Sequence, residues 1–402
     1  MDKPKLWTKD FISIAITNFL VFITFYYLLV TLPIYALQEL HGAESEAGLI
    51  ITVFLIASIL TRPLAGKWIE KSGKRIVFIS SLLILSAASI FYFIPQSIIG
   101  LLTLRFFHGI GFGMATTATG AIVADLIPES RKGEGMGYYG LTLNLGMTIG
   151  PLLGLTVMQQ AGTNVMFIIN TLCSLFALIA GLFVKLPKKT IMPEQTIKRK
   201  TGMKIGGYLE SSAIPVSLVA AFFALVYSAI VSFVSIYAKE HNLVEVAGYF
   251  FVVYAVVLLI SRPFTGKWFD SFGANLIIYP AILCFAVGTF LLSVSNTSLL
   301  FLSSAALIGL GWGTAFPSLQ TIAIQVAPPE KRALATATFL SIFDLGFGIG
   351  SFIFGIAAAN IDHGSLYFYC SFLTIIGIGV YYLLYGRISS RSIAKKVKKK
   401  IS

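Results

Sequence analysis

The sequence predicts an all-α membrane protein in which twelve transmembrane helices form two pseudo-symmetric six-helix bundles. Two observations support this fold class. Hydrophobic residues make up 56% of the 402 residues and charged residues only 12%, whereas soluble domains carry about 25% charged residues. Residues 62–68 read RPLAGKW, and residues 262–268 read RPFTGKW. The same offset relates Gly109 to Gly309 and Asn144 to Asp344. A repeat this extended indicates one structural unit built twice.

Each span is identified as an apolar stretch of about 20 residues, the length that crosses a bilayer. The first, 11–37, is too long for the core of a signal peptide and no small-residue cleavage site follows it, so it is expected to be retained. In the first half we predict spans near residues 11–37, 46–66, 76–95, 98–124, 134–160 and 164–185. In the second half we predict spans near residues 211–238, 246–266, 274–295, 298–326, 332–360 and 365–386.

The predicted organisation has two bundles joined by a polar segment. Residues 186–210 are rich in Lys, Pro, Thr and Gly and read as a linker. The bundles are then residues 1–185 and 211–386, and a basic tail follows at 387–402.

Lysine and arginine determine the predicted orientation. With Arg62 and Arg262 counted as loop residues, every Lys and Arg except Lys239 and Arg105 falls on one side of the predicted membrane. Basic loops are retained in the cytoplasm, so both termini and the linker are expected to be cytoplasmic. The expected location is the inner, cytoplasmic membrane of a bacterial cell.

The net charge of +13 is spread over these loops and the tail. Membrane lipids are therefore the expected partners of these basic residues, and nucleic acid is not. Cys173, Cys284 and Cys370 lie in apolar runs without paired spacing, so we expect core residues and neither a disulfide nor a metal site. No phosphate-binding GxxxxGK[ST] loop is found, so no ATP site, cofactor or enzymatic activity is expected.

The loop after the second span carries the first family motif. It places a glycine before an acid and then a basic-x-Gly-basic-basic cluster, through Gly66, Glu70, Lys71, Gly73, Lys74 and Arg75. This loop resembles the signature loop of the major facilitator superfamily, with Glu70 in place of the usual Asp. The second copy keeps Gly266, Asp270 and Gly273 but loses the basic cluster. The resemblance extends over essentially the whole chain and implies a transporter that works by alternating access.

In that family the loop latches the two halves together on the cytoplasmic side in the outward-open state. The resemblance suggests Asp125 and the start of the eleventh span, near Lys331 and Arg332, as its partners here. The alternative is that the bases only set the topology.

The fourth span contains Arg105 and His108, in a segment similar to the Arg-x-x-Gln-Gly motif of the family. An arginine within the bilayer costs about 2.5–3.5 kcal/mol on insertion scales, so it should face a wet cavity or a partner. The resemblance implies that Arg105 tunes a proton-carrying acid, and the alternative is a structural arginine bonded to helix carbonyls. His108 either titrates near neutral pH or acts as a neutral hydrogen-bonding residue.

The fifth span carries Gly146, Gly150, Pro151 and Gly154, a pattern that resembles the antiporter motif of exporters in the superfamily. Glycines four residues apart allow close helix packing, and the proline favours a bend. In the eleventh span Ser351 and Phe354 replace the proline and the last glycine, so this gating bend is predicted in one half only.

Asp344 is the one acid predicted to lie in the middle of a span. A carboxyl group at this depth is costly to ionise unless a cation lies close to it. We therefore interpret Asp344 as the proton carrier, with Arg105 as its tuner, and a protonated structural aspartate remains the alternative. Its repeat mate Asn144 is the neutral version of the same position.

The resulting hypothesis is a monomeric secondary transporter of the drug:proton antiporter branch, which exports a small hydrophobic or amphipathic organic compound. The predicted substrate cavity comprises Asn18, Phe22, Phe25, Tyr26, Tyr138, Asn144 and Tyr227. The alternatives are a proton symporter or facilitator for a sugar or other metabolite, and a membrane sensor or scaffold that does not transport.

Overall fold

The computed structural model describes residues 4–42, 44–185, 208–358 and 360–387. Most of the predicted linker and the tail from residue 388 therefore lie outside the described residues. The first half contains α1 (Lys9–Gln38), α2 (Glu44–Ser72), α3 (Lys74–Phe91), α4 (Ile98–Leu126) and α5 (Lys132–Leu182). The second half contains α6 (Ile214–Glu240), α7 (Val244–Phe272), α8 (Ala274–Ser293), α9 (Ser298–Gln325), α10 (Arg332–Ala358) and α11 (His363–Tyr381).

Helix α5 contains two of the predicted spans. Its 51 residues correspond to about 76 Å of helix, more than twice the hydrocarbon thickness of a bilayer. The chain breaks helical geometry at Gly162, where φ is 80° and ψ is 176°. Glycine tolerates this positive φ because it lacks a Cβ atom. The eleven long apolar helices of the described residues thus supply the twelve predicted spans, and the all-α fold class is confirmed.

The helix ends show the repeat in local chemistry. Ser97 begins α4 and Thr297 begins α9, and each side chain accepts a hydrogen bond from a backbone N–H of the first turn. Gly73 and Gly273 connect α2 to α3 and α7 to α8, with φ values of 90° and 87°. The two halves therefore use the same residue types to start and stop equivalent helices.

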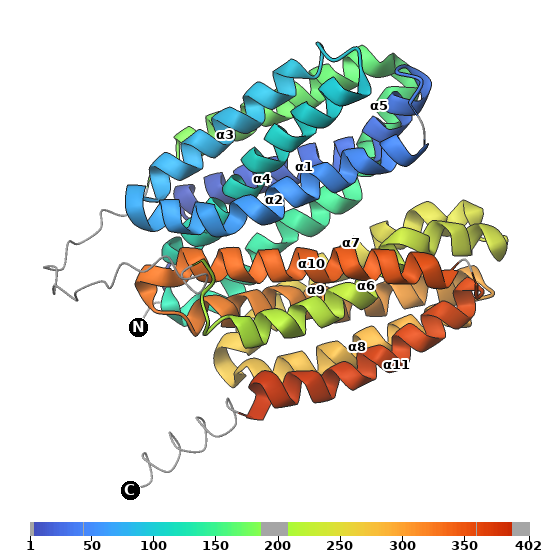
Figure 1. Ribbon diagram of the computed structural model, residues 1–402. Coiled ribbons are helices and arrows are strands. Elements are labelled where there is room, and N and C mark those ends of the chain that lie inside the picture. Colours follow the sequence, from blue (N-terminus) through green and yellow to red (C-terminus); the bar gives the residue numbers. More distant parts are fainter. Residues whose placement is uncertain (1–3, 43, 186–207, 359, 388–402) are drawn as a thin grey trace, which may run out of the picture.

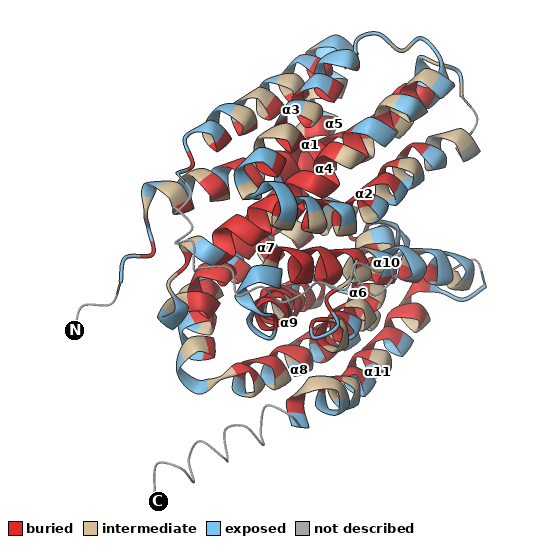
Figure 2. Cartoon of the chain, turned by 60° about the vertical axis from the view of Figure 1, so that its left-hand side comes forward, coloured by how far each residue is buried: buried red, intermediate tan, exposed pale blue. Residues whose placement is uncertain are grey.

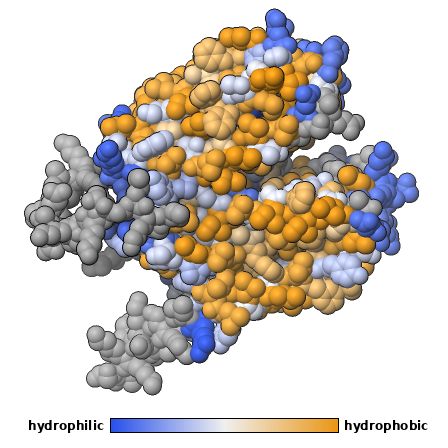
Figure 3. All heavy atoms as spheres, in the orientation of Figure 1, coloured by the Kyte–Doolittle hydropathy of each residue, from blue (hydrophilic) through white to orange (hydrophobic). Residues whose placement is uncertain are grey.

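Figure 1 shows α1–α5 in one bundle and α6–α11 in a second bundle beside it. Across the interface α5 lies along α7, and α10 lies along α2. Figure 2 shows buried residues concentrated where the helices face one another, as along α4 and α9. Apolar side chains cover much of the outside of both bundles in Figure 3, the surface that a lipid environment requires.

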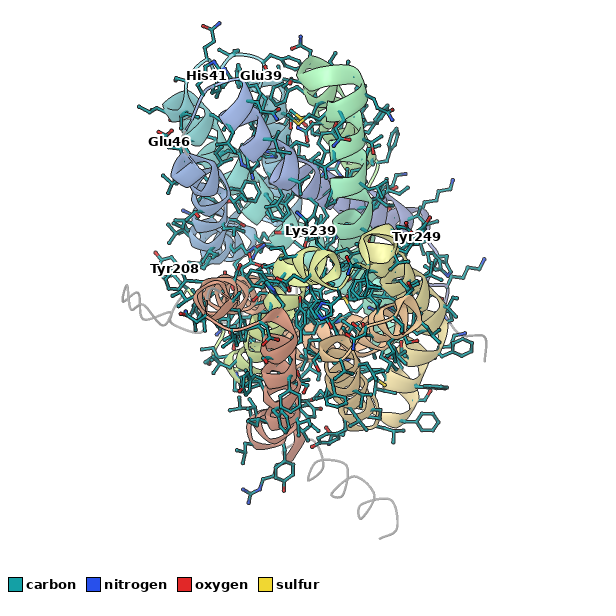
Figure 4. The ribbon with its side chains drawn as sticks, turned by 90° about the vertical axis from the view of Figure 1, so that its right-hand side faces the viewer. Glu39, His41, Glu46, Tyr208, Lys239 and Tyr249 are labelled. Carbon is teal, nitrogen blue, oxygen red and sulfur yellow. The ribbon has the colours of Figure 1, made fainter. Side chains whose placement is uncertain are left out.

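The interface between the halves is closed at one end and open at the other. We call the end that holds Gly73 and Gly273 the basic end, and the opposite one the far end. At the far end Figure 3 shows a cleft between the bundles. Figure 4 looks onto that end, with Glu39, His41 and Glu46 on the first half and Lys239 on the second.

Candidate functional site: a charge pair between the two halves

The two halves are joined near their middle by an ion pair between Arg62 of α2 and Asp344 of α10. The Arg62 side chain is 3% exposed and that of Asp344 is 15% exposed. The guanidinium also donates to the backbone carbonyl of Leu340, at 2.9 Å. The buried acid that the sequence singled out thus has a cation partner, and that partner belongs to the other half of the molecule.

The partner of Asp344 was missed at the level of sequence. The count of Arg62 and Arg262 as loop residues conflicts with the predicted spans 46–66 and 246–266, and each arginine is only 2% exposed and lies inside its helix, directly before a proline that the helix accommodates. That assignment is wrong because the helices continue past both prolines to Ser72 and Phe272. The exact repetition of Arg-Pro at an offset of 200 was the available signal.

The pseudo-symmetric position has no ion pair among the described contacts. Asn144 accepts a hydrogen bond from the Tyr254 hydroxyl at 3.1 Å and donates to the carbonyl of Gly140 at 3.0 Å. Arg262 donates to the carbonyl of Gly313 within its own half. A hydrogen bond therefore joins α5 to α7 where an ion pair joins α2 to α10.

Apart from Tyr138, the predicted cavity residues fall into three groups: Asn18, the phenylalanines of α1, and the residues between the halves. In the first half Asn18 binds Thr142, at 2.6 Å, and accepts from Thr119 and Tyr139, at 2.8 and 3.0 Å. Phe22 and Phe25 pack on Phe112, with ring centres 5.5 and 4.9 Å apart.

The third group lies between the halves. Tyr26 is within electrostatic range of Asp344, Arg62 and Tyr254. Tyr227 stacks on Tyr254 at 6.2 Å, and its hydroxyl lies 3.4 Å from the Met147 sulfur across the interface. Tyr26 therefore places a polar group near the charge pair, and Tyr227 and Tyr254 place two more at the interface between the halves.

Tyr138 departs from the prediction. Its ring lies 4.7 Å from that of Trp7, close to the start of α1 at the basic end. The next residue, Tyr139, points into the Asn18 network instead. A helix turns by about 100° per residue, and the sequence alone did not determine which of the two tyrosines faces inward.

A small cavity lies between the halves, nearer to the basic end than Tyr26, Tyr227 and Tyr254. It has room for about one water molecule and is lined by Asn18, Phe22, Thr116, Tyr139, Gly140, Leu143, Phe316, Gln320 and Leu340. The cavity is thus what remains of the space between the halves where the basic end is closed.

Arg105 and His108 form a separate buried cluster in the first half. Arg105 donates through Nε to the Ile50 carbonyl at 3.3 Å, and its guanidinium lies 4.2 Å from the centre of the Phe54 ring. His108 Nδ1 lies 2.9 Å from the Tyr92 hydroxyl. The ion pair described for Asp344 is with Arg62 and not with Arg105. The predicted grouping of Arg105 and His108 with Asp344 is therefore not found.

At the basic end the latch loop, residues 66–75, contacts several elements. Lys74 pairs with Asp125, one of the two predicted partners, and donates to the Ala121 carbonyl at 2.9 Å. Arg75 donates to the Val184 carbonyl at 3.0 Å. These contacts lie within the first half.

The loop's glycine, in contrast, faces the other half. A Cβ atom on Gly66 would lie 3.1 Å from Leu334 of α10. Glu70 and Lys71 complete α2 on the turn that follows.

The second copy of the loop makes the polar contact across the interface. The Asp270 carboxylate accepts hydrogen bonds from the backbone N–H groups of Gly133 and Glu134, at 2.6 and 3.0 Å. These are the first residues of α5, where the helix dipole favours a negative charge. A Cβ on Gly266 would lie 2.6 Å from the Glu134 Cα. Asp270 therefore fastens α7 to the start of α5.

Ion pairs near α10 extend the closed end. Arg332 binds Glu129 of the first half at 3.0 Å, while Lys331 binds Glu210 within the second half at 3.2 Å. Burial would raise the pKa of Glu210, but hydrogen bonds from Ser212 and Lys331 outweigh it and lower that pKa below its usual value. Helix α10, the eleventh predicted span, thus begins in a cluster of charged residues that come from both halves.

The glycines predicted for the gating helix pack α5 against α1. Added Cβ atoms at Gly146 and Gly150 would each lie 2.8 Å from a Cβ of α1, in Phe22 and Tyr26. At Gly154 the nearest atom is the Tyr27 carbonyl oxygen, at 2.9 Å. The helix continues through Pro151. This stripe therefore positions Phe22 and Tyr26.

Comparison with known proteins agrees with this architecture. The family model described as Major Facilitator Superfamily matches residues 14–351 and also 216–400. An uncharacterised MFS-type transporter of Methanocaldococcus jannaschii, MJ1560, is 24% identical over 92% of this chain and 97% of its own length. Multidrug resistance protein 2 of Bacillus subtilis is 22% identical over 92% of this chain and 94% of its own. The crystal structure of the human organic anion transporter MFSD10 (TETRAN) superposes with a TM-score of 0.76 at 16% identity, covering 94% and 100% of the two chains.

Proposed function

Because the chain belongs to the Major Facilitator Superfamily, and is thus a multi-pass membrane transporter and not an enzyme, we propose that it exports a small hydrophobic or amphipathic compound in exchange for protons. The observation that carries the proposal is the Arg62–Asp344 pair, because it places one ionisable carboxyl at the contact between the halves. The similarity to a protein named for multidrug resistance favours export.

The basic end faces the cytoplasm in this proposal, as the distribution of Lys and Arg predicts. The structure then corresponds to the outward-open state, with the cytoplasmic end shut. The latch loop, Asp270 on the start of α5 and the Arg332–Glu129 pair support that closure.

The ion pair determines the order in which the proton and the exported compound bind. With Asp344 ionised, its attraction to Arg62 holds α2 against α10, so the empty carrier stays closed toward the cytoplasm. A proton that enters from the far end neutralises the carboxyl and removes that attraction, and the cytoplasmic end can open. After the proton leaves to the cytoplasm, the exported compound binds between the halves and restores the outward-open state.

The tyrosines and phenylalanines beside the pair supply the binding surface. Tyr26, Tyr227 and Tyr254 offer aromatic faces and hydroxyls between the halves. Such faces bind planar or cationic organic molecules without requiring one fixed hydrogen-bond pattern. Asn18 and the small cavity lie on the cytoplasmic side of this surface, where the binding space would widen on opening.

The test is transport into everted membrane vesicles, with a panel of amphipathic cations, zwitterions and anions. Export by proton antiport predicts that the vesicles take up the compound only when their interior is more acidic than the medium. It also predicts that protons leave the vesicles when a transported compound is added. Uphill uptake into right-side-out vesicles would instead establish symport. A protein that binds a compound from the panel but transports none of the compounds in either vesicle orientation would favour a sensor or scaffold.

A further inference from the structure

We propose that a groove on the outer side of the second half holds one phospholipid molecule that stays bound through the transport cycle. The groove lies between α7, α8 and α9 and has a volume of about 180 Å³. Its walls include Thr265 of α7, Leu276, Pro280 and Cys284 of α8, and Leu310 and Thr314 of α9. Trp268 and Leu276 on its rim are 50% and 58% exposed, so the groove opens toward the membrane.

The internal repeat explains how the groove arises. The mates of Cys284 and Thr314 in the first half are Ile84 and Met114, which are both larger. Ile84 packs against α4, where a Cβ on Gly111 would lie 3.2 Å from its side chain. Met114 is 6% exposed. At these two positions the smaller Cys and Thr remove apolar volume from the second half, whereas Pro280 and Thr265 in the same wall are larger than their mates Ser80 and Ala65.

The groove also contains two hydroxyl groups that the described protein atoms leave without a hydrogen-bond partner. These are Thr265 Oγ1 and Thr314 Oγ1, both buried, and Thr314 as a whole is only 4% exposed. Their mates Ala65 and Met114 carry no such group. A buried polar group without a partner is destabilising, so the pair of hydroxyls points to a ligand with hydrogen-bond acceptors.

The depth of the groove matches the ester region of a diacyl lipid. The 29 residues of α7 span about 43 Å, so each end projects roughly 6 Å beyond a hydrocarbon core of about 30 Å. Thr265, seven residues before the end of α7 at Phe272, then lies just inside the hydrocarbon boundary, where the ester carbonyls begin. An ester carbonyl at this level accepts a hydrogen bond from the Thr265 hydroxyl without donating any. Thr314, eleven residues before the end of α9 at Gln325, lies about 10 Å inside the same boundary, beside the first part of an acyl chain.

Residues nearer the basic end suit the headgroup. Trp268 lines the groove three residues after Thr265, on the same face of α7, whereas the exposed Lys267 lies about 200° round the helix from Thr265, beside the groove and not in its wall. A lysine ammonium attracts the lipid phosphate, and tryptophan favours the interface. The apolar wall of Leu276, Pro280 and Leu310 then accommodates part of an acyl chain.

The geometry favours a resident lipid over the transported compound. Every wall of the groove belongs to the second half, so a rocking motion of one half against the other does not change it. A transported compound needs a site whose access alternates, and this groove is not such a site. The inference thus stands whether or not proton-coupled export is correct.

The experiment is native mass spectrometry of the full chain, delipidated in detergent and titrated with palmitoyl-oleoyl phosphatidylglycerol. We expect the wild type to retain one lipid at collision energies that strip the others. Cys284→Ile with Thr314→Met, the residues present in the first half, should abolish this retention. Thr265→Val with Thr314→Val should weaken it about tenfold or more. Leu283→Phe adds bulk at a 53% exposed position on α8 outside the groove and should leave it unchanged.

Labelling of Cys284 with a membrane-permeant maleimide gives a second readout that does not depend on lipid counting. Phosphatidylglycerol should slow the labelling in Leu283→Phe as in wild type, and by less in the double valine variant. Equal lipid retention by the wild type and by the variant that combines Cys284→Ile with Thr314→Met would overturn the proposal. So would a labelling rate that phosphatidylglycerol leaves unchanged.

Discussion

At the scale of single residues, Asp344 and Asn144 occupy matching positions in the two halves and meet different partners. Asp344 binds Arg62 of the other half, whereas Asn144 binds the neutral hydroxyl of Tyr254. Both matching arginines are present, but Arg262 donates to a backbone carbonyl of its own half. A single Asp-for-Asn difference therefore converts one of two equivalent interfaces into a charge pair.

Asp344→Asn keeps the shape of the carboxyl and removes its charge. We expect energised uptake into everted vesicles to fall at least about tenfold, because the carrier can no longer load and release a proton. Exchange of compound at equal pH on both sides should persist. Glu245→Gln, at an exposed acid near the far end, should transport like the wild type. Full pH-driven uptake by Asp344→Asn would exclude this residue as the proton carrier.

Removal of only one charge of the pair should cost more stability than removal of both. Arg62→Gln leaves a buried carboxylate without its cation, a loss of about 3–5 kcal/mol for such pairs. We expect its Tm in detergent to fall by several degrees, and addition of Asp344→Asn to recover most of the loss. Lys239→Gln, at an exposed lysine, serves as the control for loss of a positive charge. A double variant less stable than Arg62→Gln would argue against direct coupling.

At the scale of secondary-structure elements, glycines set the distance between paired helices. Gly146 and Gly150 bring α5 onto α1, while Gly346 and Gly350 bring α10 onto α6. The two contacts are equivalent, although only α5 carries the following proline. The packing function of the motif is therefore common to both halves, and the proline is the feature specific to α5.

Gly150→Val should disturb this packing, because its Cβ would lie 2.8 Å from the Tyr26 Cβ and 3.1 Å from the Tyr27 nitrogen. Overpacking of this kind costs about 1–3 kcal/mol, which a thermal shift in detergent can detect. Gly348→Val is the matched control, since an added Cβ there meets nothing within 4 Å. Similar Tm values for the two variants would refute a close helix contact at Gly150.

At the scale of the whole molecule, the two halves meet from their middle to the basic end and diverge at the far end (Figure 3). Asp270 on the start of α5, Arg332 with Glu129, and Arg62 with Asp344 connect them on the closed side. Loss of these contacts would let the halves rock about the central tyrosines. Control of the motion by a proton requires that at least one of these contacts be titratable.

Neutralisation of Asp344 should therefore shift the population toward closure of the far end. Spin labels at Glu39→Cys and Lys239→Cys would report on it, since Figure 4 places these residues on opposite halves of the far face. In a background without Cys173, Cys284 and Cys370, Asp344→Asn should increase the fraction of short distances in double electron–electron resonance. Asp270→Asn should act in the same direction. Identical distance distributions for wild type and Asp344→Asn would contradict control by this carboxyl.

Much of the fold follows from local properties of the chain. A run of about 20 apolar residues has to satisfy its backbone hydrogen bonds internally in lipid, so it forms a helix whatever its neighbours are. The repeat then relates one half to the other, and even the turn at Gly162 falls between the predicted spans 134–160 and 164–185. Asp344 is likewise recognisable from sequence as a buried acid. The family resemblance suggested Asp125 as a partner of the loop, and Lys74 is the loop residue that pairs with it.

The pairing of Asp344 with Arg62, in contrast, depends on tertiary packing and does not follow from local sequence. Two cations, Arg62 and Arg105, were available within the first half, and their sequence positions do not say which one faces α10. The choice depends on the rotation of α2 and α4 about their axes and on the close approach of α2 to α10 at Gly66 and Leu334. Contacts between segments 282 residues apart follow from how whole helices pack. The chain's own pattern thus specifies the helices, their repeat and the acid, while packing between the halves assigns that acid its cation.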